Sequence, residues 1–420
     1  MNKEFHKKQN FFSFSDIDSE RKDRIMKFTS TEATPAPHVP PGVLRLTGAA
    51  KEDIPMYRIQ TMNKISPVGL NRFPSELYEV GDAVQDPQGI LVRSAKLLDL
   101  EFNPGLLAIA RAGVGVNNIP LDRCAAAGIP VFSTPANANA VKELVICAML
   151  MGSRDIPGAI RWVREQAASG ADVSTVVEKG KSAFIGPELY KKTLGIIGLG
   201  AIGSIVANTA ISLGMDVYGY DPFLSVDTAL RLDRHVHVVK DINDLYKRSN
   251  YITMHIHYTE KTAHMIDASA IAAMKRGVRV INLARGEIVD DEAMLTALDT
   301  GMVAAYITDF PNNRLLTAPH VIAMPHLGAS TPESEQNCAA MAVDTLRDYL
   351  ESGNIRSSVN LPEMTMDRSG VQRLCVLHKN VPGMLANITS LFGRDGVNVE
   401  NLSNKSRGDY AYTMVDLGSK

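Results

Sequence analysis

Short apolar runs alternate with stretches of helical periodicity from about residue 56 onward. Apolar runs bounded by turn residues predict buried strands. Such runs lie at 89–92, 106–112 and 129–134 in a first unit, and at 251–256, 279–284, 303–310 and 321–326 in a second. Strands that alternate with helices along a chain are typical of parallel sheets covered by helices. The pattern therefore predicts an α/β protein with two doubly wound parallel-sheet domains.

The segment 193–221 combines a strand, a glycine turn, a helix and a second strand that ends on an acid. Gly198 allows the tight turn out of the first strand, and Gly200 lets a pyrophosphate approach the backbone. Gly203 lets the helix pack against the sheet. This succession predicts a dinucleotide-binding unit.

The start of the helix that follows Gly200 faces the predicted phosphates. Free N–H groups and the positive end of the helix dipole favour an anion there, so we predict that Ala201 and Ile202 also contact the cofactor. Asp221 ends the second strand, where a carboxylate accepts hydrogen bonds from ribose hydroxyls and repels a 2′-phosphate. The sequence therefore predicts NAD rather than NADP.

Later in the chain, the apolar positions return to helical spacing over residues 334–353. The segment 353–370 has no such period and is predicted to be a linker. A small βαββ piece is expected after it, over 371–417. At the other end, residues 1–55 contain a proline-rich stretch and are expected to form a flexible extension.

Composition narrows the classes of partner. The 420 residues are 45% hydrophobic and 21% charged, with a formal net charge of −2, which provides no basic field for nucleic acid or an acidic membrane. The four cysteines are far apart and lack metal-ligand spacing, so we expect no metal and a reduced, cytoplasmic protein. The longest clean apolar run, 144–151, is far shorter than the roughly 20 residues that span a bilayer.

Two candidate catalytic residues follow predicted strands: Arg285 follows 279–284, and His326 ends 321–326. Catalytic groups of open α/β sheets lie in loops at the carboxyl ends of the strands. A guanidinium suits a substrate carboxylate, and an imidazole exchanges a proton near neutral pH. Together they fit a 2-oxo acid/2-hydroxy acid couple.

Several motifs carry a resemblance to a known family. They are RAGVGVNN at 111–118, TPANANAVKEL at 134–144, GLGAIG at 198–203, INLARGEIVDDEAML at 281–295 and PHLGASTPES at 325–334. In this order and spacing the chain resembles the D-isomer specific 2-hydroxyacid dehydrogenase family over about 56–417. The resemblance implies a flavodoxin-like substrate-binding domain over 56–151 and 327–360, and an inserted Rossmann domain for NAD over 152–326.

The resemblance also assigns roles to single residues. It implies that Arg285 binds the substrate and that His326 is the general acid and base. Residues implied to contact the substrate are Arg93, Ser94, Val114, Gly115 and Val116.

One stretch departs from the family's pattern. A glutamate usually precedes the catalytic histidine, but the matching position here holds Asn313 or Arg314. The complete Arg/Glu/His triad is therefore not predicted. Asp309 either replaces the glutamate or contacts the nicotinamide carboxamide, as an aspartate in this stretch does in relatives.

The tail, 371–420, resembles the start of an ACT regulatory domain and is shorter than that domain usually is. By this resemblance His378, Asn380 and Asn398 are candidate contacts for an amino-acid effector such as L-serine. Relatives associate through the nucleotide domain, so a homodimer or homotetramer is expected.

The function that this resemblance implies is NAD-dependent oxidation of 3-phosphoglycerate to 3-phosphooxypyruvate, or the reverse, as the first step of serine biosynthesis. Three alternatives stay open. One is the same chemistry on another 2-oxo acid, such as 2-oxoglutarate, because Arg285 and His326 recognise only the shared oxo-acid end. The second is an NAD-sensing interaction protein like the family's transcriptional corepressors, and the third is a Rossmann binder that has lost catalysis.

Overall fold

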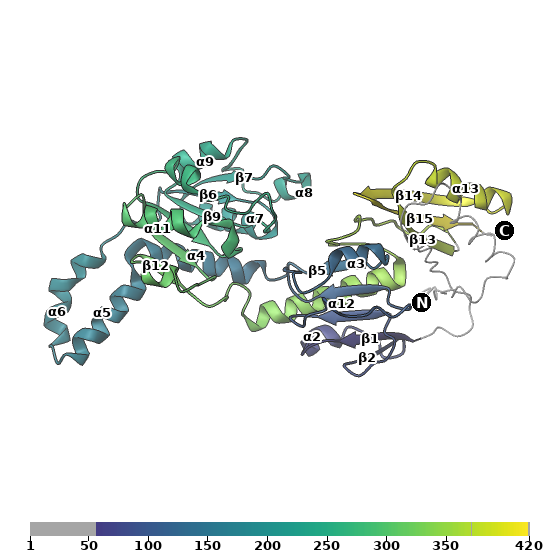
Figure 1. The fold of residues 1–420 in the computed structure, drawn as a ribbon, viewed down its shortest axis with the longest axis horizontal. Coiled ribbons are helices and arrows are strands. Elements are labelled where there is room, and N and C mark those ends of the chain that lie inside the picture. The colour runs from purple at the N-terminus through teal and green to yellow at the C-terminus, as the bar shows by residue number, and fades with distance from the viewer. Residues whose placement is uncertain (1–55, 371, 419–420) are drawn as a thin grey trace, which may run out of the picture. The chain divides into compact units, whose positions relative to one another are not determined.

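The chain divides into two units in the computed structural model, which describes residues 56–370 and 372–418 (Figure 1). Unit 1 contains the described residues up to Ala136 and from Glu335 onward. Unit 2 is the continuous segment Asn137–Ser334. The expected extension over 1–55 lies outside the described residues. The predicted α/β class is confirmed in both units, each of which is built on a parallel sheet.

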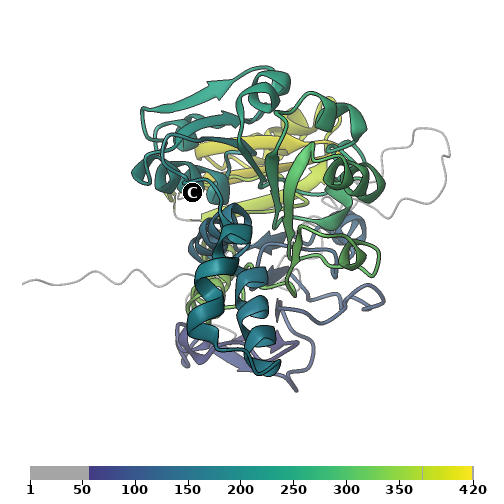
Figure 2. The same cartoon turned by 90° about the vertical axis from the view of Figure 1, so that its left-hand side faces the viewer.

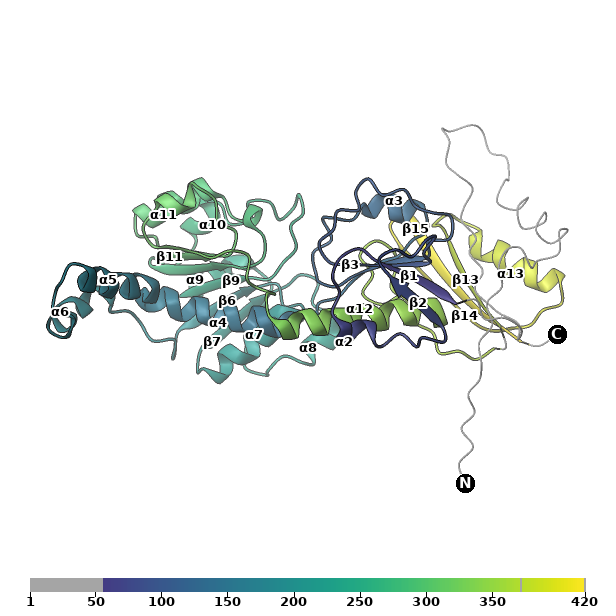
Figure 3. The same cartoon turned by 90° about the horizontal axis from the view of Figure 1, so that it is seen from below.

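Unit 1 has a five-stranded parallel sheet in the order β2-β1-β3-β4-β5. Its strands are β1 (Tyr57–Thr61), β2 (Tyr78–Gly81), β3 (Gly89–Val92), β4 (Ala108–Arg111) and β5 (Val131–Ser133). Its helices are α2 (Pro67–Leu70), α3 (Leu121–Ala126) and the part of α12 (Pro332–Ser352) from Glu335 onward. The helices α3 and α12 lie on opposite sides of this sheet (Figure 3).

The helix α12 contributes buried apolar side chains to the core of unit 1. Ala339, Val343, Leu346 and Leu350 are each at most 1% exposed and belong to the largest core cluster. At about 25 cal/mol per Å² of apolar surface removed from water, burial of Val343, Leu346 and Leu350 contributes about 1.5–3 kcal/mol each.

The prediction of a linker after α12 was wrong. Ile355, Leu361 and Met364 are almost completely buried in the same core as α12. Ile355 and Met364 also exchange backbone hydrogen bonds, of 2.8 and 2.9 Å. The segment has neither helical nor strand period, and it is held by isolated apolar side chains that reach the core one at a time.

Unit 2 has a seven-stranded parallel sheet in the order β12-β11-β10-β9-β6-β7-β8. Its strands are β6 (Thr193–Ile197), β7 (Asp216–Tyr220), β8 (Val236–Val239), β9 (Tyr251–Met254), β10 (Val278–Asn282), β11 (Val303–Thr308) and β12 (Val321–Ala323). The order reverses at β6, and ligands of open α/β sheets bind at such switch points.

Helices cover both faces of this sheet. On one face lie α4 (Ala138–Arg154) and α7 (Ala201–Ser212), and on the other lie α9 (Ile242–Arg248), α10 (Ala268–Ala272) and α11 (Asp291–Asp299) (Figure 3). The short elements of this unit are α8 (Val226–Ala229) and the 3₁₀ turns Lys181–Phe184, Gly286–Ile288 and Leu315–Thr317. The sheet is therefore buried on both faces, as parallel sheets require.

A helical hairpin of α5 (Ile156–Ala168) and α6 (Val173–Gly180) extends from unit 2 (Figures 1 and 2). Neither helix has a buried residue, although Ile156, Ile160 and Val163 give α5 an apolar stripe. The hairpin is fastened by a contact between the rings of Trp162 and Phe184, whose centroids are 5.9 Å apart. Its apolar side chains are thus available to another surface.

The tail of unit 1 has the predicted βαββ order. It consists of β13 (Gln372–Lys379), α13 (Met384–Arg394), β14 (Val399–Arg407) and β15 (Tyr410–Leu417). The three strands are antiparallel, in the order β13-β15-β14. The helix covers one face of this sheet through Ile388.

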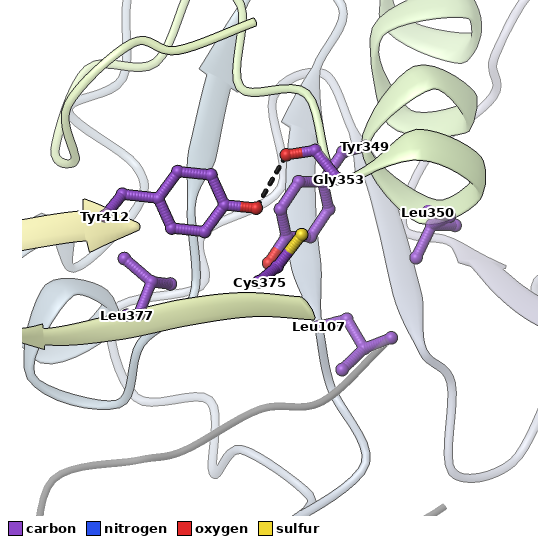
Figure 4. Close-up of a pocket in the computed structure, with 7 residues that line it drawn as sticks. All are labelled: Leu107, Tyr349, Leu350, Gly353, Cys375, Leu377 and Tyr412. Carbon is purple, nitrogen blue, oxygen red and sulfur yellow. Dashed lines mark hydrogen bonds between the residues drawn. The ribbon is translucent and has the colours of Figure 1, made fainter. Parts of the chain in front are cut away.

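The opposite face of the tail sheet is part of the main core of unit 1. Cys375, Leu377 and Tyr412 face Leu107 and the end of α12 across a cavity of about 10 Å³ (Figure 4). The Tyr412 hydroxyl donates a 2.6 Å hydrogen bond to the Gly353 carbonyl. The tail is therefore packed onto the unit and not merely tethered to it.

Candidate active site

Loops that leave the carboxyl ends of five strands of unit 2 carry the predicted site residues. Parallel strands end at the same edge of a sheet, so these loops line one edge. Along the sheet, His326 follows β12, Asp309 follows β11, Arg285 follows β10, the glycine loop follows β6 and Asp221 follows β7. The structure thus places all of the residues predicted in this unit at one edge.

The glycine loop has the geometry that its sequence predicts. Gly198 has φ +90°, and a Cβ there would meet the His255 carbonyl at 2.6 Å. A Cβ at Gly203 would lie 1.9 Å from the Gly198 carbonyl oxygen, so the helix can approach the turn only with glycine. A Cβ at Gly200 would meet nothing within 4 Å. This open space borders the first turn of α7, which has no side-chain cap, and it suits a phosphate.

Asp221 is tied to the glycine loop. Its Oδ2 accepts a hydrogen bond from the Leu199 N–H, and its Oδ1 accepts one from the Phe223 N–H, both of 2.9 Å. Each ionised carboxylate oxygen has a second lone pair. The carboxylate is thus held in place and can still accept hydrogen bonds from ribose hydroxyls.

A cleft of about 740 Å³ lies farther along this edge of the sheet, by the loops that follow β10, β11 and β12. Asp309, Phe310 and His326 are among the residues that line it. The ring centroids of Phe310 and His326 are 4.7 Å apart. The guanidinium carbon of Arg285 lies 5.9 Å from the centroid of the same phenyl ring. The structure therefore brings the predicted acid/base and the predicted carboxylate-binding residue to one aromatic ring.

Asp309 is buried beside this cleft. Its Oδ2 accepts a 3.1 Å hydrogen bond from the Gly328 N–H, whereas Oδ1 is buried without a hydrogen-bond partner among the described residues. Burial raises the pKa of Asp309, and the nearby His326 opposes that rise. A buried acceptor without a donor is costly, which indicates that a bound molecule supplies one. The amide of a nicotinamide fits this requirement.

The stretch that lacks the expected glutamate is turned toward α11. The Arg314 guanidinium pairs with Glu292 at 2.9 Å, and Asn312 donates a 2.7 Å hydrogen bond to Asp291. Within the described residues, the His326 imidazole makes no hydrogen bond. No carboxylate therefore orients this imidazole through a hydrogen bond in the way that the family's usual glutamate is expected to.

Two histidines after β9 were not predicted as site residues. Burial lowers the pKa of His255 to about 4, and its Nε2 lies 3.2 Å from the Thr253 hydroxyl. Burial, with a smaller effect from the Arg285 charge, also lowers the pKa of His257. The His255 imidazole is consequently neutral at pH 7. The signal was present in the sequence, since His255 lies near the end of the predicted strand 251–256 and His257 directly follows it.

The predicted substrate contacts of unit 1 lie in loops after two neighbouring strands. Arg93 and Ser94 follow β3, and Val114, Gly115 and Val116 follow β4.

Asn63, which the sequence did not single out, holds the first of these loops. Its Oδ1 accepts hydrogen bonds from the N–H groups of Arg93, Ser94 and Ala95, at 3.3, 3.0 and 2.7 Å. The Arg93 side chain itself pairs with Glu335 at 2.5 Å. The guanidinium is thus positioned and already has a carboxylate partner.

The candidate effector residues are divided between the two ends of the tail sheet. His378 and Asn380 lie together at the end of β13, whereas Asn398 precedes β14 and lies at the opposite end. Both ring nitrogens of His378 are engaged, by the Lys379 carbonyl at 2.7 Å and the Thr413 hydroxyl at 2.9 Å. Within this chain the three side chains do not form one pocket.

Over the described ranges, no helix is long and apolar enough to cross a membrane. The same part of the chain holds no cluster of three or more His, Cys, Asp or Glu side chains that could bind a metal ion. None of the four cysteines forms a disulfide.

Comparison with known proteins gives the class. Residues 146–328 match the NAD binding domain of the D-isomer specific 2-hydroxyacid dehydrogenases. The D-3-phosphoglycerate dehydrogenase of Escherichia coli is 33% identical over 328 residues, which are 74% of this chain and 75% of that protein. The chain belongs to the D-isomer specific 2-hydroxyacid dehydrogenase family.

Other relatives and structures are consistent with this family. The D-3-phosphoglycerate dehydrogenase of Synechocystis sp. is 36% identical over 75% of this chain, which spans only 56% of that relative's length. The NADPH-dependent glyoxylate/hydroxypyruvate reductase of Sinorhizobium meliloti is 25% identical, with a TM-score of 0.59 over 72% of this chain and 98% of that one. D-2-hydroxyisocaproate dehydrogenase shares the fold, with a TM-score of 0.58, 23% identity and coverage of 73% and 100% of the two chains.

Proposed function

We propose that this chain is an NAD-dependent dehydrogenase that interconverts 3-phosphoglycerate and 3-phosphooxypyruvate, as the first step of serine biosynthesis. The observation that carries the proposal is the arrangement of Arg285 and His326 around Phe310, beside the buried acceptor of Asp309. The names of the curated relatives support the choice of substrate.

Arg285 and His326 divide the chemistry at C2 of the substrate. The forked, permanently charged guanidinium of Arg285 binds the substrate carboxylate and polarises the adjoining carbonyl. His326 donates a proton to the C2 oxygen during reduction and removes it during oxidation. The bound nicotinamide supplies or accepts the hydride.

The cofactor is held by residues along the whole edge of unit 2. Gly198, Gly200 and Gly203 shape the phosphate loop, and the N–H groups at Ala201 and Ile202 begin the helix that faces the phosphates. In this proposal Asp221 binds the ribose hydroxyls, and the Oδ1 of Asp309 accepts the carboxamide N–H. The carboxylate of Asp221 makes NAD the preferred cofactor.

Substrate binding in this proposal also uses unit 1. The loop after β3, with Arg93 and Ser94, supplies a charge and a hydroxyl, and the loop Val114–Val116 supplies backbone N–H groups. Arg93 is the candidate partner of the substrate phosphate by its charge alone, and it must then exchange or share its contact with Glu335.

That contact favours one alternative function, the same reaction on a 2-oxo acid without a phosphate, such as 2-oxoglutarate. If Arg93 stays paired with Glu335, the residue proposed to bind the substrate phosphate is already occupied. Arg285 and His326 can still bind and reduce any 2-oxo acid.

The proposal extends to assembly, regulation and location. We propose a homodimer or homotetramer, because the α5 hairpin exposes Ile156, Ile160 and Val163, which are not buried by any of the described residues. L-Serine is the proposed effector of the tail, with His378 and Asn380 as contacts. The proposed location is the cytoplasm, in keeping with four cysteines that form no disulfide.

The experiment is NADH oxidation by the purified full chain with 3-phosphooxypyruvate (also called 3-phosphohydroxypyruvate), 2-oxoglutarate or no substrate. We expect kcat/KM to be highest with the phosphorylated substrate. Faster turnover of 2-oxoglutarate would establish the alternative, and binding of NADH without oxidation of either substrate would contradict both. Addition of millimolar L-serine tests the effector, which is rejected if neither the rate nor the Tm changes.

A further inference from the structure

The phenyl ring of Phe310 contacts both proposed catalytic groups. Its centroid is 4.7 Å from that of His326, at an interplanar angle of 49°, and 5.9 Å from the guanidinium carbon of Arg285. We propose that Phe310 is the positioning residue for both groups and takes over the orienting role of the missing glutamate. This inference rests on the proposed function.

An aromatic ring can do this for chemical reasons. The electron-rich face of a phenyl ring attracts a guanidinium within about 6 Å. An imidazole gains packing contacts in a tilted arrangement with a ring, as aromatic pairs do at about 4.5–7 Å. The His326 side chain makes no hydrogen bond to the described residues, so the ring contact restricts a torsion that is otherwise broad.

Phe310 is itself held firmly in place. Its N–H donates a 3.0 Å hydrogen bond to the hydroxyl of Thr308, the last residue of β11, which is fully buried. On the other side, a Cβ at Gly286 would lie only 3.3 Å from the Phe310 Cβ. The loop that carries Arg285 therefore packs closely against Phe310, so that Phe310 contacts both its own strand β11 and the loop after β10.

Two carboxylates that line the same cleft are engaged elsewhere. Glu292 pairs with Arg314, and Asp291 accepts a hydrogen bond from Asn312. Burial raises the pKa of Asp309 and His326 opposes that rise, and the Asp309 Oδ2 accepts a hydrogen bond from the Gly328 N–H. The contact that orients the imidazole is therefore the ring of Phe310.

The kinetic test compares ring removal with ring retention. Phe310→Leu and Phe310→Met should lower kcat about 10- to 100-fold, the range for slight misplacement of reacting groups, with the KM for NADH unchanged. Phe310→Tyr, which retains an aromatic ring, should keep most of the wild-type kcat. Phe184→Leu, the same change in the 3₁₀ turn Lys181–Phe184, is the control and should keep the wild-type kcat. Full activity of either ring-removal variant, or equal losses in the Leu and Tyr variants with an unchanged Tm, overturns the proposal.

A second readout separates this inference from the proposed reaction. Ring signals of ¹³C-labelled histidines, with His326 assigned through His326→Asn, should shift in Phe310→Leu and stay fixed in Phe184→Leu. Unshifted His326 signals in Phe310→Leu overturn the positioning role even if the wild type is active. A wild type that oxidises no 2-oxo acid contradicts the proposed function, while the histidine signals still report on the ring contact.

Discussion

Arg373 and Asp416 form a two-pronged ion pair between neighbouring strands of the tail. The guanidinium Nε lies 2.6 Å from Oδ1, and Nη2 lies 2.8 Å from Oδ2. The two side chains are 4% and 0% exposed. Arg373 also donates through Nη1 to the carbonyls of Ser352 and Met366, at 3.0 and 2.8 Å. One side chain thus joins the tail sheet to the end of α12 and to the segment that follows it.

Removing only one partner of this pair should destabilise the tail. Arg373→Met leaves the Asp416 carboxylate buried without its cation, and such losses cost about 3–5 kcal/mol. The double variant Arg373→Met/Asp416→Leu should recover most of this free energy, because two apolar side chains replace the pair. Hydrogen exchange of the β13 and β15 amides measures the local free energy of opening.

The control for that prediction is an exposed pair in the same unit. Arg356 contacts Asp348 at 2.8 Å with 59% of the arginine side chain exposed, and Arg356→Met should cost less than about 1 kcal/mol. Equal losses in Arg356→Met and Arg373→Met would contradict the importance of burial.

Acid should loosen the tail through the same pair. Burial alone disfavours the charged form of Asp416, but hydrogen bonds from Arg373 and the Ser369 N–H outweigh it and hold the pKa of Asp416 below its ordinary value. A carboxyl with a lowered folded pKa stabilises the protein above its unfolded value, about 3.9, and loses this contribution as the pH falls through the folded pKa. The protection of the β15 amides, measured against their intrinsic exchange rate at each pH, should fall below about pH 4, and less so in the double variant. An identical acid response in both proteins would rule out Asp416 as the cause.

The elements that could be predicted from sequence are those with a local period or a local motif. The glycine loop at Gly198 and the apolar stripe of α12 are examples, since the residues that define each are close to one another in the sequence. The segment that contains Ile355 and Met364 could not be predicted, because its burial depends on contacts with residues far away in sequence.

The same distinction holds for the candidate site. Arg285 and His326 were found because residues that follow parallel strands meet at one edge. Phe310 and Asn63 were missed, because a ring contact and a side chain that accepts three backbone hydrogen bonds depend on loop conformation, which has no sequence period. The sequence shows that the expected glutamate is absent, but it does not show that Arg314 pairs with Glu292.

Asp221 should set the choice of cofactor. Asp221→Ala removes the acceptor for the ribose hydroxyls and the repulsion of a 2′-phosphate, so the ratio of kcat/KM for NADH over NADPH should fall by at least about tenfold, or about 1.4 kcal/mol. Steady-state kinetics with both cofactors measure this ratio. An unchanged ratio would show that another group sets the preference.

His326 should be required for turnover and not for cofactor binding. His326→Asn should lower kcat by about 10² to 10⁴, the usual effect of losing a general acid or base. His320→Asn is a matched control, since that exposed histidine has φ +65°, a conformation that asparagine tolerates. Near-normal turnover of His326→Asn would remove the histidine from the mechanism.

The most direct test of the central claim follows the hydride itself. Wild-type protein is incubated with 3-phosphohydroxypyruvate and NADH that carries deuterium at both C4 positions, and the product is analysed by mass spectrometry and NMR. The proposed reaction predicts 3-phosphoglycerate with one deuterium at C2, formed in equal amount to the NADH consumed, and little product from His326→Asn. Consumption of NADH without deuterium at C2, or no consumption by a protein that binds NADH, would contradict it.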